Sequence, residues 1–202
     1  MIISPQELKA ILAFTSNNKK AHEFLQTVYV DCQNSRLIAT DGFSLVVFKS
    51  KDDKDLQTVV KAAPSYYVNK SMMKWCSSNE FNLHIDLITG KVADVDTGVL
   101  IGNSINIKDR ESYAPYPADI DQVITRSDIL ATNCIYSLKG FEKMRKLISI
   151  YSPEAERFLS LQSRNSDFIC FKIESNKAVI WFAIAAETEE GEPRLIIERN
   201  QF

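Results

Sequence analysis

The sequence predicts an α+β fold in which a unit of one strand, one helix and three antiparallel strands occurs three times. Three helical stretches, at 5–20, 69–78 and 137–151, each begin at or just after a Ser or Asn that can cap a helix. A short apolar run precedes each cap, and three further apolar runs separated by turn residues follow each helix. Together these observations indicate a repeat of element order rather than of residues.

The first helix has the clearest start signal. Ser4 stands at the cap position, Pro5 at the first helical position and Glu7 three residues after the cap, which is the arrangement of a capping box. Apolar residues then recur at helical spacing as far as Thr15. The apolar run before the cap, 1–3, is predicted as the first strand.

The three strands of the first unit surround a hairpin signal. Asp41-Gly42 lies between the second and third of these strands, and this dipeptide is typical of two-residue turns in which both positions have positive φ. We therefore expect an antiparallel meander of three strands over residues 27–50. The predicted strands are 28–32, 37–39 and 45–48, with a turn at 33–35.

The second and third units follow the same order. In the second unit Asn69 is the cap, and Gly90 and Gly98 mark turns between the later strands. In the third unit Ser137 is the cap, and Ser152-Pro153 ends the helix. The predicted strands are 66–68, 82–87, 91–96 and 99–105 in the second unit, and 134–136, 158–162, 168–173 and 178–186 in the third.

Two connectors separate the units. The first, 51–55, is a charged loop, and the second, 108–118, is rich in tyrosine and proline. Tyr116-Pro117 stiffens the second connector, because proline restricts its own backbone and that of the residue before it. We therefore predict two domains, 1–121 with two units and 122–202 with one.

Composition excludes several classes of protein. The chain has 202 residues, of which 45% are hydrophobic and 25% charged, as is typical of a globular protein. No apolar run approaches the roughly 20 residues that a membrane helix needs, and the amino terminus lacks the pattern of a signal peptide. The four cysteines are dispersed, and the two histidines have no metal-ligand spacing. We therefore expect a cytoplasmic protein with no cofactor, metal site or membrane partner.

Basic residues concentrate in the helical stretches. These stretches hold nine basic and two acidic residues, whereas the rest of the chain holds fifteen basic and twenty-four acidic ones. A protein that lies on duplex DNA without reading its sequence needs basic groups that face phosphates. The alternative is that lysines only keep the outer faces of amphipathic helices solvated. The nine candidate DNA-binding residues are Lys9, Lys19, Lys20, Lys70, Lys74, Lys139, Lys143, Arg145 and Lys146. For Lys19 and Lys20, a position past the end of the first helix stays open.

The third helical stretch shows two distinct faces. Lys139, Lys143 and Lys146 recur at i, i+4 and i+7 and are predicted to form one exposed stripe. The opposite side is predicted to face the core. Its residues are Leu138, Phe141, Met144, Ile148 and Tyr151.

Residues 36–45 carry a resemblance to a known family. Arg36-Leu37-Ile38-Ala39-Thr40-Asp41-Gly42, followed by Leu45, resembles the Ala-Thr-Asp-Gly-His-Arg-Leu signature in the middle domain of bacterial DNA polymerase III beta sliding clamps. Phe43-Ser44 replaces the family's His-Arg pair. A clamp domain consists of two strand–helix–three-strand units with both helices on one face of antiparallel sheets. Residues 1–121 resemble one such domain, and residues 122–202 resemble half of the last one.

The resemblance implies a non-enzymatic processivity factor of DNA replication, for which a phage or mobile element is one expected source. It implies binding of double-stranded DNA without sequence specificity through the basic helices. It also implies docking of short peptides from DNA polymerase or other partners near the Thr40–Leu45 turn. A homo-oligomer is one option, although three units per chain do not divide evenly into a ring of whole domains. The implied pocket residues are Thr40, Gly42, Phe43, Leu45, Pro117 and Ile184, with Phe43 and Ser44 making the pocket more apolar.

Two other functions stay open at this point. A monomeric clamp mimic would bind the replication machinery without encircling DNA. An aspartic protease would use Asp96, because Asp96-Thr97-Gly98 matches the tripeptide of that class, although a single copy would require a dimer. A polar hairpin turn between two strands is the simpler explanation of the same tripeptide.

Overall fold

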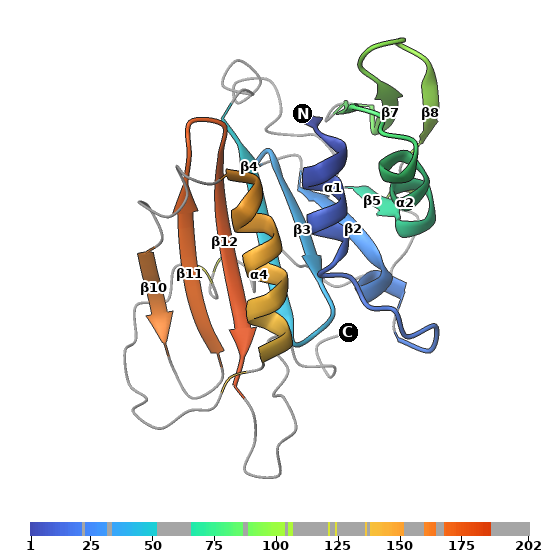
Figure 1. Cartoon of the computed structure of the whole chain (residues 1–202). Helices are drawn as coiled ribbons and strands as arrows, with labels where there is room; N and C mark the ends of the chain where they lie inside the picture. Colours follow the sequence, from blue (N-terminus) through green and yellow to red (C-terminus); the bar gives the residue numbers. More distant parts are fainter. Residues whose placement is uncertain are drawn as a thin grey trace.

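Three helices lie on the same side of a large antiparallel sheet (Figure 1). The computed structural model describes residues 1–21, 23–31, 34–51, 66–86, 89–103, 105–106, 121, 124, 136, 138–151, 160–164 and 168–186. Within these ranges the helices are α1 (Pro5–Leu12), α2 (Lys70–Ser78) and α4 (Leu138–Tyr151), with a short 3-10 helix η1 (Glu23–Gln26). None of the described helices is long and apolar enough to cross a membrane.

The strands form two antiparallel sheets. The larger sheet has the order β10-β11-β12-β4-β3-β2-β5-β9, and the smaller sheet has the order β1-β6-β7-β8. The strands of the larger sheet are β2 (Thr27–Asp31), β3 (Arg36–Thr40), β4 (Ser44–Ser50), β5 (Tyr66–Asn69), β9 (Ile105–Asn106), β10 (Ser160–Arg164), β11 (Phe168–Glu174) and β12 (Ala178–Ala185). Those of the smaller sheet are β1 (Ile2–Ile3), β6 (Leu83–Ile85), β7 (Lys91–Asp94) and β8 (Leu100–Asn103).

The first two units exchange their first strands. β1 of the first unit pairs with β6 of the second, and β5 of the second unit pairs with β2 of the first. Each meander of three strands is therefore completed by the other unit, and α1 packs against α2. This exchange explains why the first two units form a single packed body.

The third unit joins the first at β4. β12 pairs with β4 without interruption from Ala178↔Ser50 to Ile184↔Ser44, and α4 packs against both β12 and α1. The larger sheet thus includes strands from both sides of the predicted boundary at residue 121. The connector 108–118 lies outside the described residues, so the division into two domains stays a prediction.

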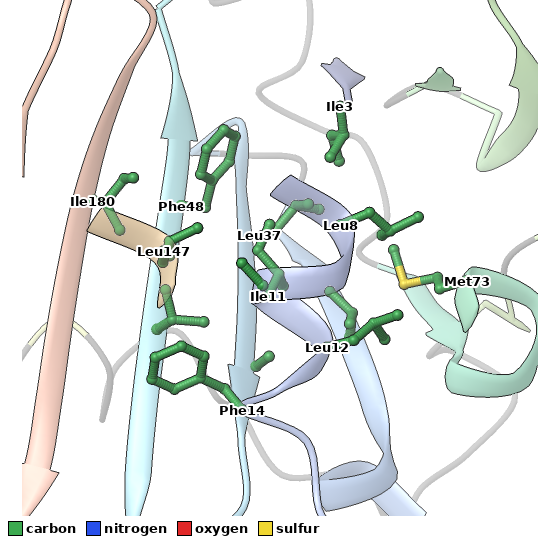
Figure 2. Packing of buried hydrophobic residues seen from close by; sticks show 14 of the residues in the cluster. Ile3, Leu8, Ile11, Leu12, Phe14, Leu37, Phe48, Met73, Leu147 and Ile180 are labelled. Carbon is green, nitrogen blue, oxygen red and sulfur yellow. The ribbon is translucent and has the colours of Figure 1, made fainter. Parts of the chain in front are cut away.

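One hydrophobic core lies between the helices and the larger sheet (Figure 2). Leu8 and Ile11 of α1 and Leu147 of α4 are fully buried there, and they meet Leu37 and Phe48 from the strands. Each such side chain stabilises the fold by about 2 kcal/mol relative to an exposed position. Alternate residues of the same strands point to a second cluster on the opposite face of the sheet. The helices are therefore held to one face by apolar burial.

Most of the predicted elements are confirmed. The capping box is present, since the Glu7 backbone N–H donates to Ser4 Oγ at 3.3 Å and the Ser4 backbone N–H donates to Glu7 Oε2 at 2.9 Å. The turns at Gly90 and Gly98 have φ values of 69° and 67°, which favour glycine. The three strands predicted in 27–50 form the expected meander.

Three expectations about the elements were wrong. The predicted strand 99–105 is two strands, because β8 pairs with β7 in the smaller sheet while β9 pairs with β5 in the larger one. α1 ends at Leu12, where Ala13 caps it and the Thr15 hydroxyl bonds to the Leu12 carbonyl at 2.7 Å. Leu138, predicted to face the core, is the first residue of α4 and is 78% exposed.

Candidate nucleic-acid interface

Basic side chains gather on the outer side of the three helices. α1 packs between α2 and α4, so the solvent-facing sides of all three form one surface (Figure 1). Within these helices Glu142 is the one exposed acidic residue, because Glu7 is half-buried in the capping box. The exposed basic residues of this helix face are Lys9, Lys74, Lys139, Arg145 and Lys146. The surface therefore carries a clear positive excess in a chain whose formal net charge is −2.

A groove runs along the seam between α1 and α4. Its volume is about 510 Å³, and its lining residues are Gln6, Lys9, Ala10, Ala13, Lys146, Ser149 and Ile150. Lys9 on α1 and Lys146 on α4 are both exposed, so a cation stands on each wall. Among the residues that the structure describes, no carboxylate lines the groove. The groove can therefore hold an anion between two ammonium groups.

Lys143 does not belong to the exposed stripe that the sequence predicts. Its ammonium group forms an ion pair with Asp41 and donates to Ser44 Oγ at 2.9 Å. It also lies 5.8 Å from the centre of the Phe14 ring. The side chains of Lys143 and Asp41 are only 20% and 19% exposed. Helical spacing alone predicts an exposed Lys143, but Asp41 on the turn beside α4 forms an ion pair with it.

Lys70 is also held within the protein. Its ammonium group donates to the Ser16 carbonyl and to Asn17 Oδ1, each at 2.8 Å. Burial lowers the pKa of Lys70, and the nearby charges of Lys74 and Lys143 lower it further. Lys70 therefore anchors the loop that follows α1.

Lys19 and Lys20 lie in that loop and not on α1. Both are exposed, and the Lys20 backbone N–H donates to Asn18 Oδ1 at 2.9 Å. The loop begins at Ser16 and Asn17, which bind Lys70 at the first turn of α2. These two lysines therefore lie at one end of the helix face rather than along it.

The turn between β3 and β4 differs from the predicted one. Gly42 has a φ of 93°, whereas Asp41 is not among the residues with positive φ. The Asp41 backbone N–H donates to the Ser44 carbonyl at 3.3 Å, so the two central residues are Gly42 and Phe43. Asp41 has a different role, because its Oδ1 accepts from the Ser44 backbone N–H at 2.8 Å and from the Ser44 hydroxyl at 3.0 Å. A single left-handed position is enough for this turn, and glycine occupies it.

The structure places two of the predicted pocket residues on opposite faces of the larger sheet. Leu45 lies in the cluster on the face of the sheet away from the helices, while Ile184 lies in the core beneath α4. The register explains this, because Leu45 pairs with Ala183 and not with Ile184, and neighbouring residues of a strand point to opposite faces. Ile184 instead meets Gly140, where an added Cβ would lie 2.6 Å from Ile184 Cγ2.

The remaining pocket residues lie at the turn or outside the described residues. Thr40 is buried, with its hydroxyl donating to the Ser44 carbonyl at 2.9 Å and accepting from the Gly42 backbone N–H at 3.0 Å. Phe43 is half-buried, and its carbonyl accepts from the Ala185 backbone N–H at 2.8 Å. Pro117 lies outside the described residues. Gly42 is buried as well, so Phe43 is the one described residue of the set that is partly exposed at the turn.

Asp96 lies on the hairpin turn between β7 and β8. Asp94 Oδ2 accepts from the Thr97 backbone N–H at 3.1 Å and from the Thr97 hydroxyl at 2.6 Å, while the exposed Asp96 accepts from Asn82 Nδ2 at 3.1 Å. These contacts are those of a polar turn, the simpler explanation that the sequence offered. Among the residues that the structure describes, no three His, Cys, Asp or Glu side chains are grouped to hold a metal ion.

Sequence reasoning missed the residues that shape the groove and hold Lys70. Ser16 and Asn17 carry no signal, because they act through a lysine more than fifty residues later in the chain. Ala10 and Ala13 do carry one, since small residues three positions apart on a helix allow a close neighbour. The spacing of Ala10 and Ala13 predicts that another helix packs against α1, but it does not predict the groove beside that contact.

Solved structures of DNA polymerase III beta subunits share this fold. One, assigned as such a subunit from Eubacterium rectale, superposes with a TM-score of 0.53 and 11% identity, over 93% of this chain and 64% of that one. The beta subunit from Thermotoga maritima gives 0.50 and 8%, over 92% of this chain and 63% of that one. The sequence matches no family model and no curated protein. This chain therefore has the sliding-clamp fold and spans less than two thirds of the length of these relatives.

Proposed function

We propose that this protein is a sliding-clamp-like processivity factor that binds duplex DNA without sequence specificity through the outer side of α1, α2 and α4. The observation that carries this proposal is the charge of that surface: five exposed basic residues against one exposed acid, on adjacent helices of a clamp fold. The proposed role is not enzymatic, and it needs no cofactor. It places the protein in the cytoplasm with the replication machinery.

The composition of the helix face suits contact with phosphates rather than bases. Four of its five exposed cations are lysines, whose flexible point charges follow a phosphate backbone without the fixed fork that arginine presents to guanine. Each neutralised phosphate changes the slope of log affinity against log salt by about −0.9, so five contacts give a slope of about −4 to −5. Binding of this kind allows movement along the duplex.

The Thr40–Leu45 turn is the proposed docking element for peptides from DNA polymerase or other partners. Phe43 provides an apolar, half-buried side chain at its tip. Thr40 and Leu45 support the turn from within, because both are buried. Ile184 is removed from the proposed site, since it faces α4.

A matched pair of charge reversals tests DNA binding. Lys74→Glu with Lys139→Glu reverses two charges on the helix face, whereas Lys91→Glu with Lys177→Glu reverses two exposed charges on β7 and on the β11–β12 turn. We expect the first pair to weaken binding of a labelled random-sequence duplex by at least about tenfold at low salt. The second pair should change it much less. Equal losses in both pairs, or no duplex binding by the wild type, would refute the proposal.

Light scattering with nicked circular DNA distinguishes a clamp mimic from a clamp. A ring or oligomer that holds DNA changes its mass in light scattering when nicked circular DNA is added. A monomer that binds replication proteins but leaves the circular DNA untouched would be a mimic. This alternative is considered because three units per chain do not divide evenly into a ring of whole domains.

A further inference from the structure

We propose that the groove between α1 and α4 is a seat for one strand of the DNA sugar–phosphate backbone, which fixes how the duplex lies on the helix face. This inference rests on the proposed function, since it assigns a position to the DNA that the helix face binds. It goes further, because a uniformly basic surface would hold DNA in many equivalent positions. The groove gives one position an advantage.

The hollow follows from small side chains at the seam. α1 and α4 are in contact, yet α1 presents Ala10 and Ala13 toward α4, and these leave the space beside Ile150 unfilled. Ala10 is buried and Ala13 half-buried. The floor of the groove is therefore apolar, and its volume of about 510 Å³ lies within the range of pockets that hold small ligands.

The walls of the groove carry the charges that a phosphate needs. Lys9 of α1 and Lys146 of α4 both line the groove, so each of the two helices contributes one cation. Within the described part of the chain, neither ammonium group has a hydrogen bond or ion pair, whereas that of Lys143, three residues before Lys146, is already paired with Asp41. Two unpaired cations facing one groove repel each other, and an anion between them removes that repulsion.

The chemistry of the lining favours a sugar–phosphate strand over other anions. A deoxyribose phosphate chain alternates an apolar sugar face with a charged group, which matches an apolar floor between cationic walls. Gln6 adds a side-chain amide at the rim, and such groups commonly contact phosphate oxygens, whereas the Ser149 hydroxyl donates to the Lys146 carbonyl at 2.8 Å. An acidic protein segment would match the charges, and binding of such a segment in place of DNA is one outcome of the test.

The test fills the groove without changing its charge. Ala13 is the C-cap residue of α1 with a φ of −63°, so a larger side chain there strains no backbone. Ala13→Phe should occupy the hollow, while Ser78→Phe adds the same ring at an exposed end of α2 outside the groove. Both variants should keep the thermal midpoint of the wild type, which is measured first.

We expect Ala13→Phe to weaken binding of a labelled random-sequence duplex by about tenfold and to make the slope of log affinity against log salt shallower by about 0.9, because the phosphate in the groove is no longer neutralised although no cation is lost. Ser78→Phe should bind as the wild type does. Lys9→Glu with Lys146→Glu should weaken binding more than the equal reversal at Lys74 and Lys139. In a parallel arm, the same variants are tested against a labelled poly-glutamate peptide.

The outcomes distinguish the groove proposal from the proposed function, which is DNA binding by the helix face. If Ala13→Phe binds duplex normally while reversal at Lys74 and Lys139 still weakens binding, the groove proposal is overturned and the proposed function stands. If the wild type binds no duplex, both are overturned. If Ala13→Phe loses the peptide but keeps the duplex, the groove takes an acidic protein segment, which also overturns the DNA seat.

Discussion

Two groups of lysines on α1, α2 and α4 have opposite surroundings. Lys143 and Lys70 donate to acceptors within the protein, whereas Lys9 and Lys146 face an open groove. Lys143 and Lys146 are less than one turn apart on α4. The difference teaches that acceptors on a neighbouring turn or loop, rather than position on the helix, decide which cations are available to a ligand.

Lys70 and Lys143 lose hydration on burial, and each connects two parts of the fold. Partial burial of Lys70 and Lys143 removes hydration from both ammonium groups, and the hydrogen bonds that they form offset this loss. In return Lys143 joins α4 to the β3–β4 turn, and Lys70 joins α2 to the loop after α1. The ammonium groups of Lys9 and Lys146 make no such connection to the described residues, so removing them should leave the fold intact.

The largest effect that this comparison predicts is at Asp41. Asp41→Ala removes the acceptor of two backbone N–H groups, the Ser44 hydroxyl and the Lys143 ammonium group. We expect the free energy of unfolding to fall by about 2–3 kcal/mol, because partly buried donors are left without partners. Urea unfolding measures it. Asp96→Ala, at an exposed turn with one side-chain hydrogen bond from Asn82, is the control and should stay within about 0.5 kcal/mol.

A second, smaller effect separates the two neighbouring lysines. Lys143→Met should lower the free energy of unfolding by about 1–2 kcal/mol through the loss of its ion pair with Asp41, and should leave the duplex affinity almost unchanged. Lys146→Met should do the reverse, with unchanged stability and weaker duplex binding. Urea unfolding and fluorescence anisotropy are measured on both variants. Two variants that lose equal amounts of DNA affinity would show that Lys143 leaves Asp41 to contact DNA.

The sequence predicts more of the fold than of the site. Caps, turn residues and apolar runs are local signals, and they placed the helices and most strands close to where they lie, including the capping box at Ser4 and the turn at Gly98. Pairings between distant segments carry no such signal. The alignment of β12 with β4 therefore came only from the structure, and a shift of one residue in that register decides which way Ile184 points.

The same limit applies to charge. Helical spacing shows which side of α4 Lys143 and Lys146 occupy, but it cannot show that Asp41, about a hundred residues earlier, folds back beside the first of them. Nor can it show that Ala10 and Ala13 leave a hollow next to the second. Availability of a charge is a tertiary property, because it depends on what packs against the helix.

The smallest predicted effect is a pH dependence at Lys70. Burial, Lys74 and Lys143 lower its pKa below the ordinary value of 10.5. The unfolded chain therefore binds the proton more tightly, so the contribution of Lys70 to stability is present above pH 10.5 and is lost as the pH falls through the lower folded pKa. Between neutral pH and 10.5 the free energy of unfolding should thus rise more in the wild type than in Lys70→Met, as measured by urea unfolding.

Two further variants test the cause of this rise in stability with pH. The rise should be smaller than in the wild type in Lys143→Met, which removes one cause of the pKa shift. It should equal that of the wild type in Lys139→Met, whose exposed charge is not among those causes. Parallel curves for the wild type and Lys70→Met would mean that Lys70 is as well solvated as the groove lysines, and the contrast between the two groups would then rest on Lys143 alone.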